Sequence, residues 1–435
     1  MELIPLILLT LALLRYALGR PSKGTSVGRR AVIYDAIRPR GLYVIGKAGS
    51  GKTTALLNLM YRDILKRRGI GFIDPHGDAS HELLKLIPKE RAEQTIYFEP
   101  ARHPIPLNLM RADNEFEMEV MASDIITTFR RLSDTWGPRM DGILRYTVAA
   151  LVKYRKASFL DIHAFLTNEK FRKTVLQAIG DREVIRFFTE DFPRMPDNAA
   201  DPIIYRLSQV MLSPTLCRVL GNADATFDFY TEMNRKHILI FNLAGLGGNS
   251  SFIGSLLVSQ FQLAAMRRAR IPEKFRVPFY LYVDEFQNFT SEAFETVLSE
   301  ARKYKLCLTI AHQFASQIPE RMRKAILGNV AAALMFQCDI GDASHFKGML
   351  RQFTPEDLVE QDVGQAILYL PKVTRKIRTF RPPRVAHSCI TDILANTARY
   401  IPATPKALPA PASAPQPETK PKGRRRKKDE SASVQ

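Results

Sequence analysis

Apolar residues recur along this chain in two alternating patterns: short β-prone runs, and longer segments in which they return every three or four positions. Residues 41–45 form the first run, and residues 52–68 form the helical segment that follows it. Further β-prone runs at 71–74 and 95–98 continue the alternation to about residue 110. Because strands that alternate with helices usually form parallel sheets covered by those helices, the pattern predicts an α/β fold.

The pattern changes between residues 113 and 231. Strand-like runs disappear there, and apolar side chains recur only at helical spacing, for example at Met121 and Ile125. We therefore predict an all-α inserted domain over 113–231. It divides the α/β domain into a first half at 21–112 and a second half at 232–400.

The β-prone runs return in the second half, so the alternation of strands and helices resumes. A long helical segment over 250–268 and another over 291–303 lie between them. The predicted strands lie at 237–243, 279–283, 307–311, 333–336 and 366–369. Together, the two halves predict a mostly parallel central sheet.

The two ends of the chain differ from the rest in composition. Residues 3–14 are almost entirely apolar, and basic residues follow from Arg20 onward. The segment 1–20 is short for a membrane span, which needs about 17–25 residues, but the basic residues after it are typical of a cytoplasmic flank. We expect a short N-terminal membrane anchor, with a buried or interfacial helix as the alternative. Residues 401–435 are rich in proline, alanine and basic residues, which predicts a disordered tail.

The chain is strongly basic. Its 435 residues include 63 Lys and Arg against 44 Asp and Glu, which gives a formal net charge of +19. Such an excess suggests a polyanionic partner or an anionic membrane surface, and we favour nucleic acid. The four cysteines are widely spaced and form no CxxC pair, which argues against a disulfide framework or a zinc site and fits a reducing cytoplasm.

The loop between the first predicted strand and its helix carries the signature of a phosphate-binding loop, G-x-x-x-x-G-K-[ST]. Its glycines let backbone N–H groups surround a phosphate, and the helix N-terminus adds partial positive charge. Lys52 is expected to reach the β- and γ-phosphates of ATP, and the Thr53 hydroxyl to ligate Mg²⁺. The residues of the predicted nucleotide site are Gly46, Lys47, Ala48, Gly49, Ser50, Gly51, Lys52, Thr53 and Thr54.

An acid pair, Asp284 and Glu285, directly follows the apolar run 279–283. Phosphoryl transfer depends mostly on positioning and on neutralisation of charge. Asp284 is therefore expected to hold Mg²⁺ through water, and Glu285 to orient and polarise the attacking water. Gln313 ends the next predicted strand, where its side chain can sense the γ-phosphate.

Two further groups of polar residues leave alternatives open. Arg302 lies at the end of the predicted helix 291–303. It is either an arginine finger that reaches the site of a neighbouring subunit or a cation that stabilises the helix C-terminus. Asp74, His76 and Asp78 lie at the carboxyl end of the second predicted strand. Because no other metal ligands converge on them, we expect a structural turn beside the nucleotide rather than a metal site.

These segments resemble, in content and in order, the motifs of the HerA/FtsK superfamily of P-loop ATPases. Within that superfamily the chain is most similar to the TraD/TraG-like coupling proteins of type IV secretion and bacterial conjugation. The resemblance covers about residues 40–369, and the segments that carry it are 46–54, 72–78, 136–139, 242–243, 282–289, 300–304 and 311–313. Members of this branch usually have a longer transmembrane region, often of two helices.

The resemblance implies a RecA-like motor domain, a hexameric ring of identical subunits and ATP-driven movement of DNA through the central channel. It also implies an arginine-finger position and a sensor position. The catalytic residues are then Lys52, Glu285, Arg302 and Gln313, and the Mg²⁺ ligands are Thr53 and Asp284. The all-α domain is expected to face the bacterial cytoplasm and to receive DNA with its relaxase, at the inner face of the cell membrane beside the secretion channel.

The sequence therefore predicts an ATP-driven DNA translocase, the coupling protein that feeds DNA into a type IV secretion apparatus. One alternative is a related motor for phage DNA packaging or DNA processing. Another is an ATP switch that does not translocate DNA but assembles a membrane complex. Stimulation of ATP hydrolysis by DNA separates the motors from the switch, and membrane insertion of residues 1–20 separates the coupling protein from the other motors.

Overall fold

The computed structural model of this protein describes residues 24–131, 136–289, 298, 300–381 and 388–402, all of which fall within one compact unit. Three predicted segments lie wholly or mostly outside these residues: the N-terminal anchor at 1–20, the helix at 291–303 and the tail at 401–435. None of the helices in the described ranges is long and apolar enough to cross a membrane.

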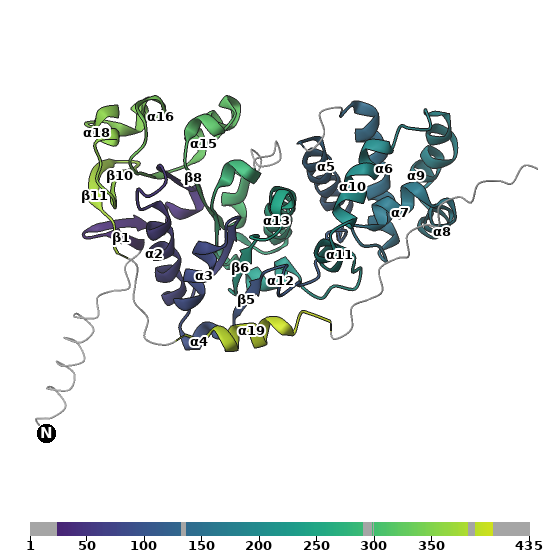
Figure 1. The fold of residues 1–435 in the computed structure, drawn as a ribbon, viewed down its shortest axis with the longest axis horizontal. Helices are drawn as coiled ribbons and strands as arrows, with labels where there is room; N and C mark the ends of the chain where they lie inside the picture. Colours follow the sequence, from purple (N-terminus) through teal and green to yellow (C-terminus); the bar gives the residue numbers. More distant parts are fainter. Residues whose placement is uncertain (1–23, 132–135, 290–297, 299, 382–387, 403–435) are drawn as a thin grey trace, which may run out of the picture. The chain divides into compact units, whose positions relative to one another are not determined.

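A nine-stranded sheet lies at the core of the α/β part of the structure (Figure 1). Its strand order is β11-β10-β9-β3-β8-β7-β4-β6-β5, and β10 and β11 add an antiparallel edge to an otherwise parallel sheet. The predicted α/β fold with a mostly parallel central sheet is thus confirmed. The strands are β3 (Leu42–Ile45), β4 (Gly69–Asp74), β5 (Thr95–Phe98), β6 (Ile238–Asn242), β7 (Phe279–Val283), β8 (Leu306–His312), β9 (Ala332–Met335), β10 (Gln365–Leu370) and β11 (Val373–Arg378).

The strands divide their side chains between two apolar cores, one on each face of the sheet. In β3, Leu42 and Val44 belong to the core beneath α2, and Tyr43 and Ile45 belong to the core beneath α13. The helices of the first core are α2 (Lys52–Leu65), α3 (Asp78–Lys85), α4 (Lys89–Ala92) and α19 (Ile390–Ala398). Those of the second include α12 (Phe229–Asn234), α13 (Ser250–Met266), α15 (Glu320–Asn329), α16 (Ile340–Ser344), α17 (Lys347–Leu350) and α18 (Pro355–Val359).

Every described element between β5 and β6 is helical. Before α12, these helices are α5 (Glu115–Arg131), α6 (Pro138–Tyr154), α7 (Asp161–Thr167), α8 (Glu169–Ile179), α9 (Arg182–Arg186), α10 (Asp201–Met211) and α11 (Pro214–Leu220). α5 packs against α13 of the sheet domain. Trp136 packs against Phe129 of α5, and its indole N–H donates a hydrogen bond to Asp141. The boundaries of a separate domain at 113–231 stay a prediction.

Three elements escape the sequence patterns: a hairpin formed by β1 (Gly24–Gly28) and β2 (Ala31–Tyr34), the edge strand β11, and α19. β1 consists largely of glycine, serine and threonine, and β11 mixes apolar with charged residues, so neither forms an apolar run. Each of these elements is stabilised by a neighbouring element rather than by an apolar pattern of its own. β1 pairs with β2, β11 pairs with β10, and α19 packs on β5.

A buried polar network beneath α2 ties this helix to β7. The Asp63 carboxylate accepts hydrogen bonds from Arg38 at 3.1 Å, from the Tyr282 hydroxyl at 2.5 Å and from Arg68 at 2.8 Å. Burial alone would lower the pKa of Arg38, but the Asp63 carboxylate raises it above its ordinary value, and Tyr282 adds to this effect. Because Tyr282 lies two residues before Asp284, the network fixes the helix of the phosphate-binding loop to the strand that carries the acid pair.

Asp63→Ala is expected to lower the free energy of unfolding by about 3–5 kcal/mol, because it leaves Arg38 buried without its carboxylate partner. Urea denaturation followed by circular dichroism measures this loss. The matched control is Glu82→Ala, which removes an exposed ion pair with Lys85 and is expected to cost less than about 1 kcal/mol. Equal losses in the two variants would show that the buried network contributes no more than a surface pair.

Candidate nucleotide-binding site

The predicted phosphate-binding loop connects β3 to α2 at the carboxyl edge of the sheet. Gly49 and Gly51 have φ angles of +77° and +103°, and Gly51 caps the first turn of α2. A left-handed turn that leads into a helix N-terminus forms a concave site in which backbone N–H groups bind anions. Ser50 adds a buried hydroxyl that has no hydrogen-bond partner within the described part of the chain. The loop therefore fits a phosphate group.

Two segments from the antiparallel side of the sheet hold this loop in place. The backbone N–H of Gly364 donates to the carbonyl of Ser50 at 2.9 Å, and that of Lys47 donates to the carbonyl of Gln337 at 2.9 Å. A Cβ atom on Gly51 would lie 3.1 Å from the backbone of Gly364, so both the contact and the φ angle favour glycine. Sequence reasoning missed both supports, because no pattern links their positions to the loop.

Lys52 begins α2 and lies against the acid pair that follows β7. Its ammonium group is 3.1 Å from Glu285 Oε1 and 3.8 Å from Asp284 Oδ1, and all three side chains are buried. The strand order brings them together, because only β8 separates β3 from β7. Thr53 is exposed at the same end of the helix, and Thr54 is half-buried.

The two acids differ in proton affinity. Burial raises the pKa of Asp284 to about 6, and Lys52 opposes part of this rise. Burial also acts to raise the pKa of Glu285, but hydrogen bonds from Gln287 and Gln313 together with the charge of Lys52 outweigh it and lower the pKa below its usual value. Glu285 is therefore ionised at neutral pH, as a group that polarises water has to be, and Asp284 protonates first as the pH falls.

Two glutamine amides hold the Glu285 carboxylate. Gln313 donates to Oε1 at 2.8 Å and Gln287 donates to Oε2 at 2.7 Å. Gln313 directly follows β8, where the sequence predicts it, and the structure brings it into the cluster. Gln287 was missed, because it lies in a short turn, Phe286–Phe289, that no apolar pattern reveals. Glu285 itself has a φ angle of +44°, in the left-handed region, so the chain turns sharply as soon as β7 ends.

The structure does not bring Arg302 to this cluster. Arg302 is exposed in the turn Ala301–Tyr304, which precedes β8, whereas Gln313 follows β8. β8 has seven residues and is about 20 Å long. Within one chain, Arg302 therefore lies at the amino ends of the parallel strands, whereas the phosphate-binding loop lies at their carboxyl ends. If Arg302 takes part in hydrolysis, it has to act on the site of another subunit.

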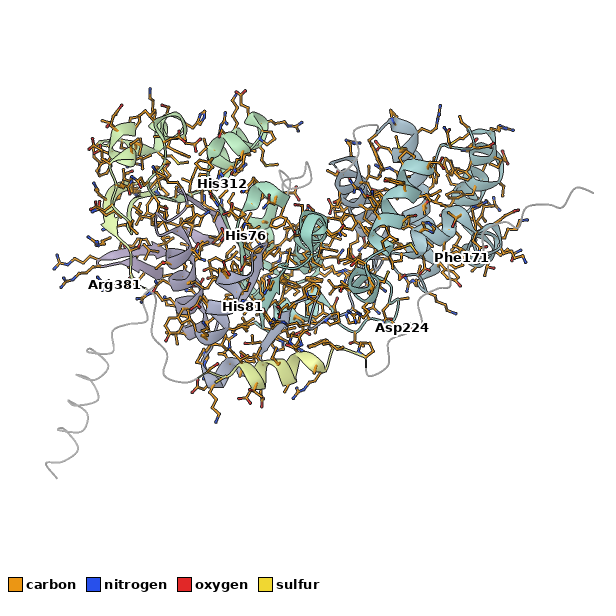
Figure 2. All side chains as sticks on the ribbon, in the orientation of Figure 1. His76, His81, Phe171, Asp224, His312 and Arg381 are labelled. Carbon is orange, nitrogen blue, oxygen red and sulfur yellow. The ribbon has the colours of Figure 1, made fainter. Side chains whose placement is uncertain are left out.

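A tight turn follows β4. The buried carboxylate of Asp74 accepts hydrogen bonds from the backbone N–H groups of His76 at 3.0 Å and of Ser80 at 2.8 Å. The side chains of His76 and Asp78 are exposed (His76 is labelled in Figure 2). No group of three or more His, Cys, Asp or Glu residues that could hold a metal ion occurs among the residues that the structure describes.

His312, also labelled in Figure 2, ends β8 directly before Gln313. Its ring contacts the Tyr43 hydroxyl, and its Nδ1 lies 3.0 Å from the carbonyl oxygen of Phe314. Burial lowers the pKa of His312 to about 4, so the ring is neutral at physiological pH. It therefore adds no positive charge beside Lys52.

Comparison with known proteins supports the resemblance inferred from the motifs. Residues 278–347, which contain the acid pair, match a family model described as the TraM recognition site of TraD and TraG. The plasmid coupling protein TrwB in complex with ADP and Mg²⁺ is similar in structure, with a TM-score of 0.62 at 14% sequence identity over 85% of this chain and 92% of that chain. The chain resembles the conjugative coupling proteins.

A second solved structure is also similar to this chain. VirB4 of Thermoanaerobacter pseudethanolicus is similar with a TM-score of 0.52 at 15% identity, over 84% of this chain and 98% of that chain. A comparison with curated protein sequences gave no match. The predicted resemblance is confirmed, and the likeness to TrwB confirms the RecA-like fold of the domain that contains the sheet.

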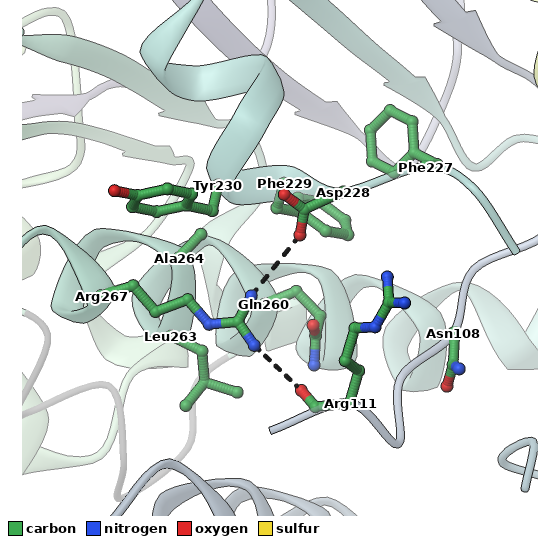
Figure 3. Close-up of a pocket in the computed structure, with 10 residues that line it drawn as sticks. All are labelled: Asn108, Arg111, Phe227, Asp228, Phe229, Tyr230, Gln260, Leu263, Ala264 and Arg267. Atoms are coloured by element: carbon green, nitrogen blue, oxygen red, sulfur yellow. Dashed lines mark hydrogen bonds and ion pairs between the residues drawn. The ribbon is translucent and has the colours of Figure 1, made fainter. Parts of the chain in front are cut away.

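A separate pocket lies away from the acid cluster, where the chain enters and leaves the helical segment (Figure 3). Arg267, which follows α13, crosses this pocket. Its guanidinium lies 3.5 Å from Asp228, donates to the carbonyl of Arg111 at 3.3 Å and pairs with Glu117 at 2.9 Å. Arg267 thus joins both connections of the helical segment to the sheet domain, which indicates a structural junction.

Gly51→Ala is expected to weaken ATP binding by about tenfold or more, because a Cβ atom in left-handed backbone costs about 1–2 kcal/mol and here also meets Gly364. Titration with a fluorescent ATP analogue measures the affinity. The matched control is Gly328→Ala in α15, where a Cβ atom meets nothing within 4 Å. The control should keep its affinity for ATP, and unchanged affinity in both variants would contradict the role given to the loop.

Proposed function

We propose that this chain is an ATP-driven DNA translocase that serves as the coupling protein of a type IV secretion apparatus. The observation that carries the proposal is the convergence of Lys52, Asp284 and Glu285 on a phosphate-binding loop. The likeness to TrwB supports it, since that protein has been solved with ADP and Mg²⁺ and with a non-hydrolysable ATP analogue.

In the proposed reaction, the backbone N–H groups of residues 46–51 bind the phosphates of ATP, and Lys52 exchanges the Glu285 carboxylate for the β- and γ-phosphates. Thr53 and Asp284 would hold Mg²⁺, which neutralises charge on those phosphates. Once Lys52 has moved away, Glu285 orients the attacking water. Gln313 donates a hydrogen bond to Glu285, and from this position its side chain would sense the γ-phosphate.

The position of Arg302 supports an assembly of several subunits. Arg302 and its own phosphate-binding loop lie at opposite ends of the parallel strands. Arg302 can therefore act as an arginine finger only at the nucleotide site of a neighbouring subunit, and a ring of subunits would provide such a neighbour. We propose a homo-hexamer, as the resemblance implies. The net charge of +19 supports DNA as the polyanion that passes through it.

We further propose that the partner is a relaxase–DNA complex and that residues 1–20 anchor the motor at the inner face of the bacterial membrane. The match of residues 278–347 to a model described as the TraM recognition site of TraD and TraG supports an apparatus of this kind.

The first test is the rate of ATP hydrolysis by the purified full-length protein, with and without DNA. We expect DNA to raise the rate. Lys52→Ala should abolish hydrolysis, because the contact with the β- and γ-phosphates is lost, and Glu285→Gln should bind ATP without hydrolysing it. A rate that DNA does not change would favour an ATP switch, and normal hydrolysis by either variant would overturn the assignment of the site.

Arg302→Ala should reduce hydrolysis by about 10³-fold or more if Arg302 is an arginine finger. Rings that mix Arg302→Ala with Lys52→Ala subunits should regain part of the activity, because the two defects then lie on opposite sides of a shared site. Lys303→Ala, which removes the neighbouring exposed cation, is the control and should leave the rate unchanged. Failure of the mixed rings to recover any activity would leave Arg302 with a structural role only.

A further inference from the structure

Two hairpins at the antiparallel side of the sheet together present a surface of exposed cations. Gly28 of β1 forms a β-bridge with Thr379, which directly follows β11, so the β1–β2 turn lies beside the end of that strand. We call this surface the basic edge. Its exposed cations are Arg29, Arg30, Lys372, Lys376, Arg378 and Arg381 (Arg381 is labelled in Figure 2).

The two hairpins themselves contain no acidic residue, and the two acids that border them, Asp35 and Asp362, bond to Arg68 and Gln365. No acid occurs in the sequence at 24–34 or at 372–381, and none of the six cations has an ion-pair partner among the residues that the structure describes. Some exposed lysines elsewhere are paired, as in Lys173–Glu169 and Lys324–Glu320, and others are, within the described part of the chain, single unpaired cations rather than part of a group of six. The charge here is therefore not balanced within the chain.

Exposed apolar side chains accompany these cations. Tyr34, at the end of β2, is 55% exposed and pairs in register with Gly24, and Val373 at the start of β11 is 47% exposed. Tyrosine mixed with lysine and arginine is typical of surfaces that meet the headgroup region of a membrane.

The basic edge also lies close in sequence to the apolar N-terminal segment. Gly24 follows Leu18, the last apolar residue of that segment, by six positions, a distance of at most about 20 Å along an extended chain. A membrane that holds this segment would therefore lie within reach of the edge.

We propose that the basic edge binds the anionic phospholipid headgroups of the membrane that holds the N-terminal segment. The proposal rests on the N-terminal anchor of the proposed function and adds a second, electrostatic contact to it. Two contacts fix the orientation of a motor relative to the bilayer, whereas a single flexible tether does not. Anionic lipid attracts juxtamembrane lysine and arginine by roughly fivefold in binding constant for each charge.

Charged residues on β11 also have a simpler role, since they keep an edge strand from pairing with other chains. That role does not depend on lipid, so lipid composition separates the two explanations. Nucleic acid is the other polyanion that could bind the edge, and the test measures it in parallel.

The test compares co-flotation of the full chain with vesicles of phosphatidylcholine alone and with vesicles that also contain phosphatidylglycerol. The edge variant carries Arg29→Gln, Arg30→Asn, Lys372→Gln and Lys376→Gln, in which asparagine replaces Arg30 because φ there is +60°. The control variant removes four exposed cations elsewhere, with Lys89→Gln, Lys156→Gln, Lys170→Gln and Arg182→Gln.

Phosphatidylglycerol should increase the binding of the unmodified chain to vesicles. We expect this increase to be at least about tenfold smaller in the edge variant and unchanged in the control variant. Binding to phosphatidylcholine alone reports the N-terminal segment and should be the same in all three proteins. If this binding is absent, the anchor fails, while the behaviour with phosphatidylglycerol still tests the edge. Equal losses in both variants, or a loss of DNA affinity with unchanged lipid binding, would overturn the proposal.

Discussion

The parallel pairing of β8 between β3 and β7 is the constraint on which the candidate site depends. It sets the end of β3, with its phosphate-binding loop, two strands away from the end of β7, with its acid pair. At that separation the ammonium of Lys52 reaches Glu285 directly. A buried lysine needs a counter-charge, and the acid pair supplies it. Gln313 joins the cluster because it directly follows the strand that lies between the two.

The sequence predicts eight of the nine strands of the sheet, and it places the phosphate-binding loop after β3 and the acid pair after β7, because apolar runs and fixed spacings are local properties of the chain. The same reasoning misses Gln287, whose position depends on the left-handed turn at Glu285, and Gly364, whose contact with Ser50 joins distant segments. It also misses β1 and β11, which owe their strand structure to their partners rather than to their own composition. The sequence leaves open whether Arg302 is an arginine finger or a cation at a helix end. Only the direction of β8 shows that Arg302 lies away from the phosphate-binding loop of its own chain.

The two faces of the sheet make different contacts with the residues around the candidate site. Beneath α2, the network of Arg38, Asp63 and Tyr282 fixes the helix of the phosphate-binding loop to β7. On the other face, α13 packs against both α5 and the turn after Glu285, where Phe289 fills the space that a side chain at Gly254 would need. The helix that packs against the helical segment thus also contacts the residues next to the candidate site, so that a shift in the turn after Glu285 would be felt directly by α13 and α5.

The separation in sequence between β3 and its partners has a consequence for synthesis of the chain. β3 lies among the first 50 residues, yet both of its neighbours, β8 and β9, are made more than 250 residues later. During translation both edges of this apolar strand remain without their native partners, and the loop that follows lacks its contact with Gly364. Contacts of such long range form slowly. The nascent protein is therefore unable to bind nucleotide natively until most of it has left the ribosome, and it depends on protection from aggregation during that time.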